Sequence, residues 1–202
     1  MLDFSNSKIL IVGDVMLDKY YFGKVDRISP EAPVPIVNIQ KEESRLGGAS
    51  NVANNIVSLG GHSLLCGFFG HDLFGKEIER ISRHKNIDTF LLKTSSPTIT
   101  KARIIGGKQQ IVRVDYEDKS ELNADNKKLF RDTISRILPE YDILVISDYG
   151  KGLISEDLCR YLIKLAHKYD KKVIIDPKGK NWEKYSGADI VTPNVKELSD
   201  IV

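Results

Sequence analysis

The segment KILIVGD, residues 8–14, decides the fold class of this chain. Its consecutive aliphatic residues, Ile9 to Val12, are typical of a strand that is buried on both faces of a parallel sheet. Gly13 and Asp14 then end the strand. The same pattern, a short aliphatic run that ends at a small or polar residue, recurs at residues 63–70, 142–147, 172–176 and 189–192.

Helical patterns lie between these strands. We expect helices over residues 48–59, 73–84, 124–138 and 155–169, and a further helix that begins near Asn194. The alternation of strands and helices predicts an α/β fold with a mostly parallel sheet covered by helices. The 202 residues fit one large domain, or most of one, and contain no internal repeat or linker.

Two stretches do not fit the alternating pattern. Residues 20–25 with 34–40, and residues 98–117, have the composition of antiparallel strands. The second stretch is predicted to fold back in a two-residue turn at Gly106 and Gly107. Because such excursions from a parallel sheet often form a flap over a ligand site, we expect a small β lid.

Composition excludes several classes of function. With 41% hydrophobic and 29% charged residues the chain is globular, and its net charge of +2 gives no support to nucleic-acid binding. No apolar run is long enough to span a bilayer, and the first residues do not resemble a secretory signal, so we expect a cytoplasmic protein without a membrane partner. Cys66 and Cys159 lack metal-ligand spacing, and two buried, reduced thiols are the simplest interpretation.

Ligands of open α/β sheets bind beyond the carboxyl ends of the strands, and polar residues follow several of the predicted strands. Asp14 and Asp18 could accept hydrogen bonds from sugar hydroxyls, although ordinary turn or cap aspartates explain them as well. Gly47 and Gly48 could let the backbone approach a ligand at a helix start from which Asn51 projects, or could serve packing alone.

Lysines and a capped helix follow the later strands. Lys151 and Lys178 stand close behind Asp148 and Asp176, where they could hold phosphate as flexible point charges or be ordinary surface lysines. The final segment TPNVKELSDIV places Asn194 and Glu197 at capping-box spacing. Glu197 could also serve a hydrated Mg²⁺, which takes only one or two carboxylates.

Several common site motifs are missing from the chain. It has no G-x-x-x-x-G-K-[ST] phosphate loop, no G-x-G-x-x-G after the first strand and no G-x-S-x-G elbow. The four histidines show no paired ligand spacing. A bound nucleotide would therefore need another kind of site.

Taken together, these segments resemble the ribokinase-like, or phosphofructokinase B type, carbohydrate kinases, and most closely the branch that acts on heptose 7-phosphate. The segments that carry the resemblance are GDVMLDKYYFGKVDRISPEAPVPIV, RLGGASNVANNIVSLG, PTITKARII with QQIVRVDYE, SDYGKG, IDPKG and TPNVKE. They cover nearly the whole chain. The GG-x-x-N element belongs to the wider family, whereas ISPEAPVP and SDYGKG point to the heptose branch.

The resemblance implies a three-layer α/β/α fold with a β lid at about residues 19–43 and 98–117, which in this family often also forms a homodimer clasp. It implies transfer of the ATP γ-phosphoryl group to the anomeric hydroxyl of the heptose phosphate, giving the 1,7-bisphosphate on the way to ADP-heptose and the lipopolysaccharide core. The implied sugar-binding residues are Asp14, Asp18, Gly47, Gly48 and Asn51. The implied residues for the ATP phosphates are Lys178, Asn194 and Glu197, with Glu197 reaching Mg²⁺ through water.

A phosphorylated sugar needs a further basic contact. Lys101 and Arg103 share one face of their predicted strand by period-two alternation, and we predict that they contact the substrate phosphate. If Gly106 and Gly107 form the whole turn, Arg113 lies opposite Thr100 and faces the other way. A slip of the register by one residue would reverse that statement.

The family's G-A-G-D motif, which supplies the proton acceptor and the anion hole, is absent from these 202 residues, as is an H-x-G-H adenylyltransferase motif. We therefore expect the N-terminal, sugar-binding part of one kinase domain, incomplete at its C-terminus, with the catalytic aspartate downstream of Val202. Two other interpretations stay open: another sugar kinase of the same family, or a non-catalytic module for sugar-phosphate binding or dimerisation.

We expect the purified 202-residue chain alone to show no measurable phosphoryl transfer, because it lacks the family's proton acceptor. The measurement is incubation with ATP, Mg²⁺ and heptose 7-phosphate followed by detection of the bisphosphate. ATP-dependent formation of that product would contradict the expectation.

Overall fold

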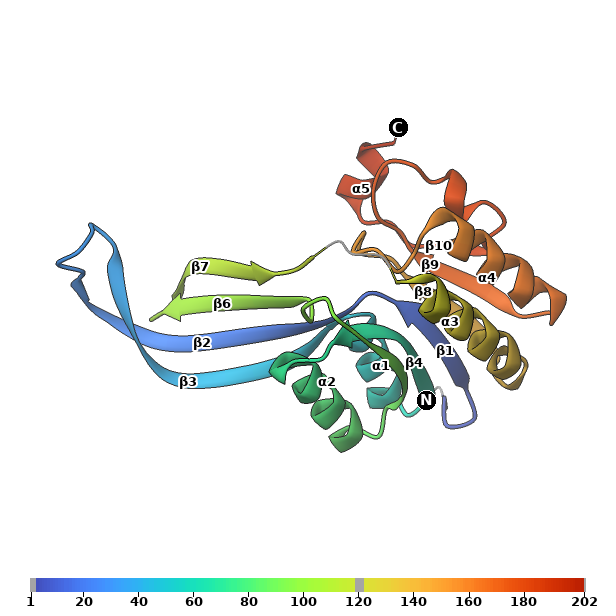
Figure 1. Ribbon diagram of the computed structural model, residues 1–202, viewed down its shortest axis with the longest axis horizontal. Helices are drawn as coiled ribbons and strands as arrows, with labels where there is room; N and C mark the ends of the chain where they lie inside the picture. Colours follow the sequence, from blue (N-terminus) through green and yellow to red (C-terminus); the bar gives the residue numbers. More distant parts are fainter. Residues whose placement is uncertain (1–2, 119–121, 202) are drawn as a thin grey trace.

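The computed structural model describes residues 3–118 and 122–201, which form two β-sheets and the helices packed on the larger one (Figure 1). The larger sheet has the order β10-β9-β8-β1-β4-β5, and every neighbouring pair in it is parallel. Its strands are β1 (Lys8–Gly13), β4 (His62–Gly70), β5 (Asp88–Thr94), β8 (Ile143–Ser147), β9 (Lys172–Asp176) and β10 (Ile190–Val191). The predicted parallel sheet is thereby confirmed.

Strand β5 is absent from the prediction. It lies at the edge of the larger sheet and pairs only with β4, and most of its side chains are partly or fully exposed. An edge strand of this kind needs no long aliphatic run, so its sequence, DTFLLKT, lacks the signal that marks the central strands.

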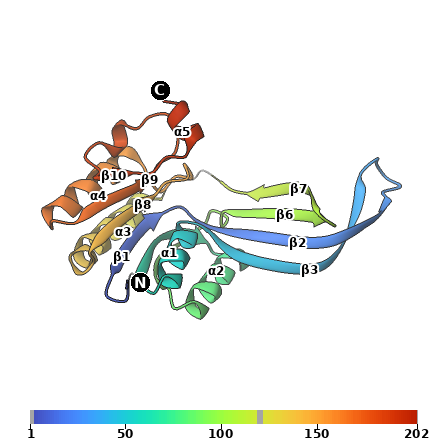
Figure 2. The ribbon, with the colours of Figure 1, turned by 180° about the vertical axis from the view of Figure 1, so that it is seen from behind.

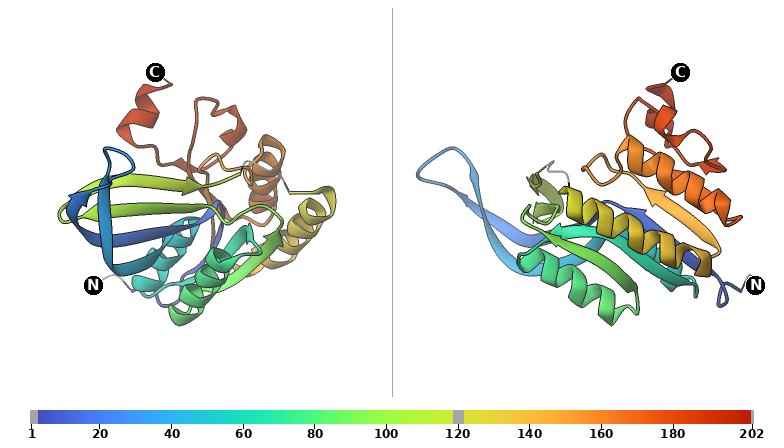
Figure 3. Two further views of the ribbon diagram at one scale, coloured as in Figure 1. Left: turned by 60° about the vertical axis from the view of Figure 1, so that its left-hand side comes forward. Right: turned by 45° about the vertical axis from the view of Figure 1, so that its right-hand side comes forward.

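Helices cover both faces of the larger sheet. Figure 2 shows α1 (Ala49–Ser58) and α2 (Leu73–His84) on one face, and the right-hand view of Figure 3 shows α3 (Ala124–Ile137) and α4 (Glu156–Lys168) on the other. All four predicted helices are confirmed, and so is the last one, which is the short α5 (Val195–Ser199). Two short 3₁₀ helices, η1 (Leu138–Glu140) and η2 (Glu183–Tyr185), complete the set in the described residues.

The end of the chain follows α5 closely. Val202, named in the prediction of the catalytic aspartate, lies outside the described residues. The last described residue is Ile201, two residues after α5 ends at Ser199. No residue of the described part of the chain takes the place of that aspartate in a G-A-G-D motif.

The core lies in two layers because consecutive side chains of β1 point to opposite faces. Leu10 and Val12 belong to the cluster under α3 and α4, whereas Ile9 and Ile11 belong to the cluster under α1 and α2. Leu10, Ile11 and Val12 are fully buried. A strand buried on both faces requires the continuous aliphatic run seen in the sequence.

The second sheet extends away from the helices (Figure 1; Figure 3, left). It has the order β3-β2-β6-β7, with β2 (Val15–Ile28), β3 (Pro35–Gly48), β6 (Thr100–Gly106) and β7 (Gln109–Tyr116). The strands within each predicted stretch pair antiparallel as expected, β2 with β3 and β6 with β7, whereas the two stretches join through a parallel pairing of β2 with β6. Strand β2 follows β1 and strand β6 follows β5, and β1 and β5 run in the same direction in the larger sheet. The chain therefore enters the second sheet in the same direction both times, which makes β2 and β6 parallel.

The hairpin register also differs from the prediction. Gly106 pairs with Gln109, so the turn residues are Gly107 and Lys108 rather than the two glycines. Gly106 belongs to the strand, where a Cβ would come within 2.6 Å of the Val25 Cγ2 atom; Gly107 supplies the positive φ of 63°. A bulge follows, and Arg113 lies opposite Arg103. Directly paired residues share a face, so Arg113 faces the same way as Arg103.

Both cysteines are free and buried, as predicted. Burial raises the pKa of both thiols, that of Cys159 to about 12. Within residues 3–118 and 122–201, no helix is both long and apolar enough to cross a membrane.

Candidate functional site

Three aspartates meet at the carboxyl edge of the larger sheet. Gly13 of β1, Ser147 of β8 and Asp176 of β9 are register partners and form a row across the sheet. Asp14 and Asp148 are the residues that directly follow Gly13 and Ser147. The Asp14 N–H donates to the Ser147 carbonyl at 3.1 Å, and the Asp148 N–H donates to the Asp176 carbonyl at 3.0 Å. The three strands therefore deliver three carboxyl groups to one place.

The Asp14 carboxylate holds the loop that follows β8. Its Oδ2 accepts from the N–H groups of Tyr149 at 2.8 Å and Lys151 at 3.1 Å, and its Oδ1 accepts from the N–H of Leu153 at 3.3 Å. Burial raises the pKa of Asp14, and the three N–H donors offset part of that rise. These hydrogen bonds show that the Asp14 carboxylate organises the loop, and its predicted contact with a sugar hydroxyl stays a prediction.

Asp148 is buried and joins three segments of chain. Its Oδ1 accepts from the Gly150 N–H at 2.7 Å, and its Oδ2 accepts from the Tyr185 hydroxyl at 2.7 Å and from the Lys184 ammonium. The Tyr185 hydroxyl in turn accepts from the Lys178 N–H at 2.9 Å. Burial raises the pKa of Tyr185. Sequence reasoning missed Tyr185 and Lys184, because both lie in η2, more than thirty residues from Asp148, and belong to no recognisable motif.

The structure brings together Lys178, Asn194 and Glu197. The Lys178 Nζ lies 2.9 Å from Glu197 Oε1, and the capping box is present, with both of its hydrogen bonds between Asn194 and Glu197 near 3 Å. Burial alone would raise the pKa of Glu197, but the hydrogen bonds from Asn194 and Lys178 lower it overall. The cap and a ligand role for these residues are compatible.

Oxygen donors suited to Mg²⁺ lie at the same place. Asp176 is half-buried, and its pKa is raised first by burial and then by the negative charge of Glu197. A hydrated divalent cation would relieve that repulsion, and Mg²⁺ needs only one or two carboxylates when phosphates supply the other ligands. Within the described part of the chain, no three metal-ligating side chains form a cluster.

A second group of predicted residues surrounds Asp18. Its Oδ1 lies 2.5 Å from Arg103 Nη1, and a Cβ on Gly47 would come within 2.7 Å of its Oδ2. Gly48 has a φ of 55°, and a Cβ there would collide with the backbone carbonyl of Asp14. Both glycines are therefore required for close packing of β2, β3 and the start of α1.

Asn51 lies apart from this ion pair. It is exposed in the first turn of α1 and makes no hydrogen bond within the described residues. With Asn54 and Lys85 it lines an open groove of about 420 Å³. Arg45, which pairs with Asp18 across β2 and β3, lines the same groove, so the groove reaches the neighbourhood of Asp18.

Basic side chains converge where the second sheet approaches the loop after β8. The Lys101 Nζ lies 5.9 Å from the centre of the Tyr149 ring and has no carboxylate within 4.0 Å among the described residues. Burial lowers the pKa of Lys101, and the charges of Lys151 and Arg113 lower it further, against the effect of Asp18. The Lys151 side chain is only 18% exposed and lies 2.5 Å from Glu117. The interpretation of Lys151 as a solvated surface lysine is therefore wrong.

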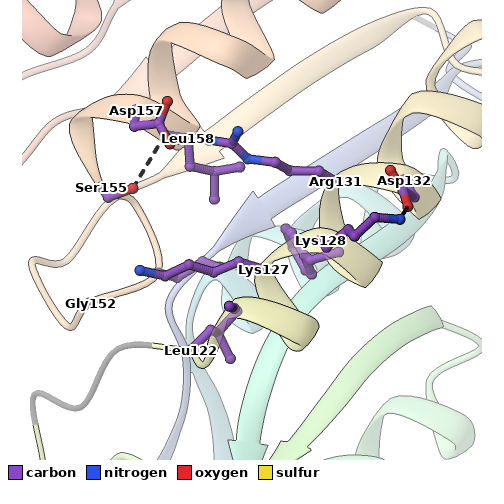
Figure 4. Close-up of a pocket in the computed structure, with 12 residues that line it drawn as sticks. Leu122, Lys127, Lys128, Arg131, Asp132, Gly152, Ser155, Asp157 and Leu158 are labelled. Carbon is purple, nitrogen blue, oxygen red and sulfur yellow. Dashed lines mark hydrogen bonds and ion pairs between the residues drawn. The ribbon is translucent and has the colours of Figure 1, made fainter.

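A further hollow of about 370 Å³ lies behind the same loop, between α3 and the start of α4 (Figure 4). Arg131 of α3 reaches across to Asp157 of α4, and Lys128 pairs with Asp132 on its own helix. None of the residues predicted to bind ligand lines this hollow.

Known proteins similar to this chain include carbohydrate kinases. The family model described as pfkB family carbohydrate kinase matches residues 6–202. The bifunctional protein HldE of Helicobacter pylori strain P12 is 47% identical over 193 residues, which cover 95% of this chain and 42% of that protein. The D-beta-D-heptose 7-phosphate kinase of Bordetella bronchiseptica is 44% identical over 199 residues, which cover 98% of this chain and 62% of the kinase. The chain thus spans less than two thirds of either relative.

Solved structures share the fold at low identity. The tetrameric inhibited form of phosphofructokinase-2 from Escherichia coli superposes with a TM-score of 0.76 at 20% identity, covering 97% of this chain and 64% of that one. Arabidopsis thaliana ribokinase complexed with ribose and ATP superposes with a TM-score of 0.68 at 18% identity, covering 97% and 62%. These similarities confirm the α/β/α fold class.

We predict that Asp14→Ala lowers the free energy of unfolding by about 3 kcal/mol, because it leaves the buried or partly buried N–H groups of Tyr149, Lys151 and Leu153 without an acceptor. Urea unfolding measures the loss, and hydrogen exchange should show these amides opening faster. The matched control is Asp26→Ala, at an exposed position of β2, which should change stability by less than about 0.5 kcal/mol. Unchanged stability and amide protection in Asp14→Ala would refute this role.

Proposed function

The chain belongs to the pfkB family of carbohydrate kinases, and from that premise we propose that it serves the ATP-dependent phosphorylation of D-glycero-D-manno-heptose 7-phosphate at the anomeric hydroxyl. The observation that carries the proposal is the 44% identity over 199 residues to a protein named D-beta-D-heptose 7-phosphate kinase. The product would be the 1,7-bisphosphate, a precursor of ADP-heptose and the lipopolysaccharide core. Because ATP and sugar phosphates are cytoplasmic metabolites, we infer that the protein acts in the cytoplasm.

We propose that the sugar lies against Asp18 beside the Gly47-Gly48 corner, with Asn51 at its margin. The Asp18 carboxylate keeps Oδ2 available next to Gly47 while Oδ1 engages Arg103, so it can accept a hydrogen bond from a sugar hydroxyl. Asp14 supports this site indirectly by fixing the loop beside it. Lys101, unpaired and half-buried, is the cation best suited to the phosphate at the far end of the sugar; Arg103 would assist from the same face.

We propose that the ATP phosphates approach Lys178, Asn194 and Glu197. Lys178 would place its ammonium group against them, and the Asp148–Tyr185 pair fixes the backbone from which Lys178 projects. Mg²⁺, held by Glu197 through water, would neutralise charge on the phosphates during transfer. We assign no proton acceptor to this chain, since none of its residues up to Val202 matches the family's catalytic aspartate.

A second candidate is another phosphosugar kinase of the family. The similarity in fold to phosphofructokinase-2 favours fructose 6-phosphate as the competing substrate.

We predict that the chain binds heptose 7-phosphate more tightly than fructose 6-phosphate or ribose in calorimetric titrations. Asp18→Ala should weaken heptose 7-phosphate binding about 10-fold or more, because a charged hydrogen-bond acceptor is lost and Arg103 is released. Asp26→Ala, farther along the same strand, is the control and should bind as the wild type does. Tighter binding of fructose 6-phosphate or ribose would reject the heptose assignment.

We further propose that the second sheet acts as the lid and joins two copies of the chain. Val112, Val114 and Tyr116 alternate along β7, share one face and are all exposed, although Tyr116 also contacts Phe74 of α2 with ring centres 5.5 Å apart. Exposed Val25, from β2, extends this aliphatic surface near the hairpin end. An aliphatic sheet face beyond the body of the protein is a suitable dimer contact.

Sedimentation velocity should therefore reveal a dimer, and Val112→Glu should shift it to monomer, because a charge would be buried in the contact. Leu73→Glu, at an exposed apolar position on α2, should leave the dimer intact. A wild-type chain that is monomeric at high micromolar concentration would exclude the proposed contact.

A further inference from the structure

We propose that Lys151 is a specificity-determining residue which, together with Lys101, receives the phosphate group that the sugar substrate already carries, and that Glu117 holds Lys151 until this phosphate displaces it. The inference rests on the proposed function. It assigns a role to Lys151 and Glu117, and it adds a displacement step that separates phosphorylated from unphosphorylated sugars.

The backbone of Lys151 is fixed by the larger sheet. Its N–H and that of Tyr149 both donate to Oδ2 of Asp14, at 3.1 Å and 2.8 Å. From this anchored position the Lys151 side chain reaches Glu117, one residue beyond the end of β7, at 2.5 Å. The ion pair therefore connects the loop of the larger sheet to the second sheet, across the space where the two sheets meet.

Lys101 arrives at the same space from β6. Its register partner on β7 is Asp115, and Glu117 follows Asp115 by two residues. The Lys101 Nζ lies over the ring of Tyr149, which stands two residues before Lys151 in the anchored loop. The effect of the Lys151 charge on the pKa of Lys101 agrees with this proximity. Two lysines thus reach one location from two different sheets.

The local charges are unbalanced in favour of an anion. Arg113 is satisfied by Asp115 through two hydrogen bonds of 2.8 and 2.9 Å, and Lys151 is satisfied by Glu117. Lys101 has no such partner among the described residues. These three cations and the carboxylates of Asp115 and Glu117 together leave one positive charge. The nearby Asp18 and Arg103 form an ion pair and neutralise each other.

A phosphate group can replace Glu117 at Lys151. It carries a charge of about −1.5 to −2 and three acceptor oxygens, so it can engage Lys101 and Lys151 at once, whereas the Glu117 carboxylate has a single charge and is 29% exposed. Lysine is a point charge on a flexible stem, which allows the exchange without movement of the anchored backbone. Glu117 can turn to water at little cost, since partly exposed ion pairs contribute little to stability.

Selectivity follows from the exchange. A sugar without the distal phosphate leaves Lys151 bound to Glu117 and gains nothing from Lys101. Glu117 would thus act as an internal competitor that weakens binding of phosphorylated ligands slightly. Lys151 would strengthen binding of phosphorylated ligands only.

The test is the ratio of the dissociation constants of D-glycero-D-manno-heptose and its 7-phosphate, measured by calorimetry on the whole chain. Lys151→Gln should lower the preference for the phosphorylated sugar about 10-fold by weakening that ligand alone. Glu117→Gln should tighten the 7-phosphate about 3-fold and leave the unphosphorylated heptose unchanged. Adding Glu117→Gln to Lys151→Gln should have no further effect. Lys24→Gln and Glu31→Gln, both exposed, are the matched controls and should behave as the wild type does.

Thermal melts establish that every variant is folded before its ratio is interpreted. The inference is overturned if Lys151→Gln keeps the wild-type ratio, if both ligands weaken equally, or if Glu117→Gln weakens the 7-phosphate. A wild-type chain without any preference for phosphorylated sugars overturns it too. If the wild type instead prefers fructose 6-phosphate, the heptose assignment fails. The role of Lys151 is then tested by the ratio of the dissociation constants of fructose and fructose 6-phosphate.

Discussion

The buried carboxylate of Asp14 is the interaction on which the arrangement of the site depends. It stands directly after β1 and accepts hydrogen bonds from three N–H groups of the loop that follows β8, at Tyr149, Lys151 and Leu153. A buried carboxylate is costly unless it is hydrogen-bonded, and the three donors supply what water would otherwise supply. One side chain therefore sets the position of an entire loop, and with it the side chains that this loop directs toward the second sheet.

The second sheet has two faces of different chemistry. Asp18, Lys101, Arg103 and Arg113 share the face that meets the anchored loop, whereas Val112 and Val114 share the opposite, aliphatic face. Because alternation puts neighbouring residues on opposite faces, the same short strands can carry ion pairs on one side and apolar contacts on the other. A change of register by one residue would mix the two sets.

Much of the fold and part of the site can be predicted from sequence. The aliphatic runs predicted the central strands, helical periodicity predicted α1 to α4, and capping-box spacing predicted the start of α5. The edge strand β5 was missed because a half-exposed strand carries no continuous apolar run. The hairpin turn was misplaced because Gly106 is needed for packing against Val25, a contact between strands that sequence spacing does not reveal.

The sequence by itself determined the family, the parallel sheet and the residue types that stand after each strand, because these depend on local patterns and short motifs. Only the tertiary structure decided which of those residues work together. It joined Asp14 to the loop of Lys151, Asp148 to Tyr185 and Lys178 to Glu197, and it left Lys101 without a carboxylate partner among the described residues. The physical reason is that hydrogen bonds and ion pairs act over a few ångströms, and residues far apart in sequence reach that distance only when the strands have paired.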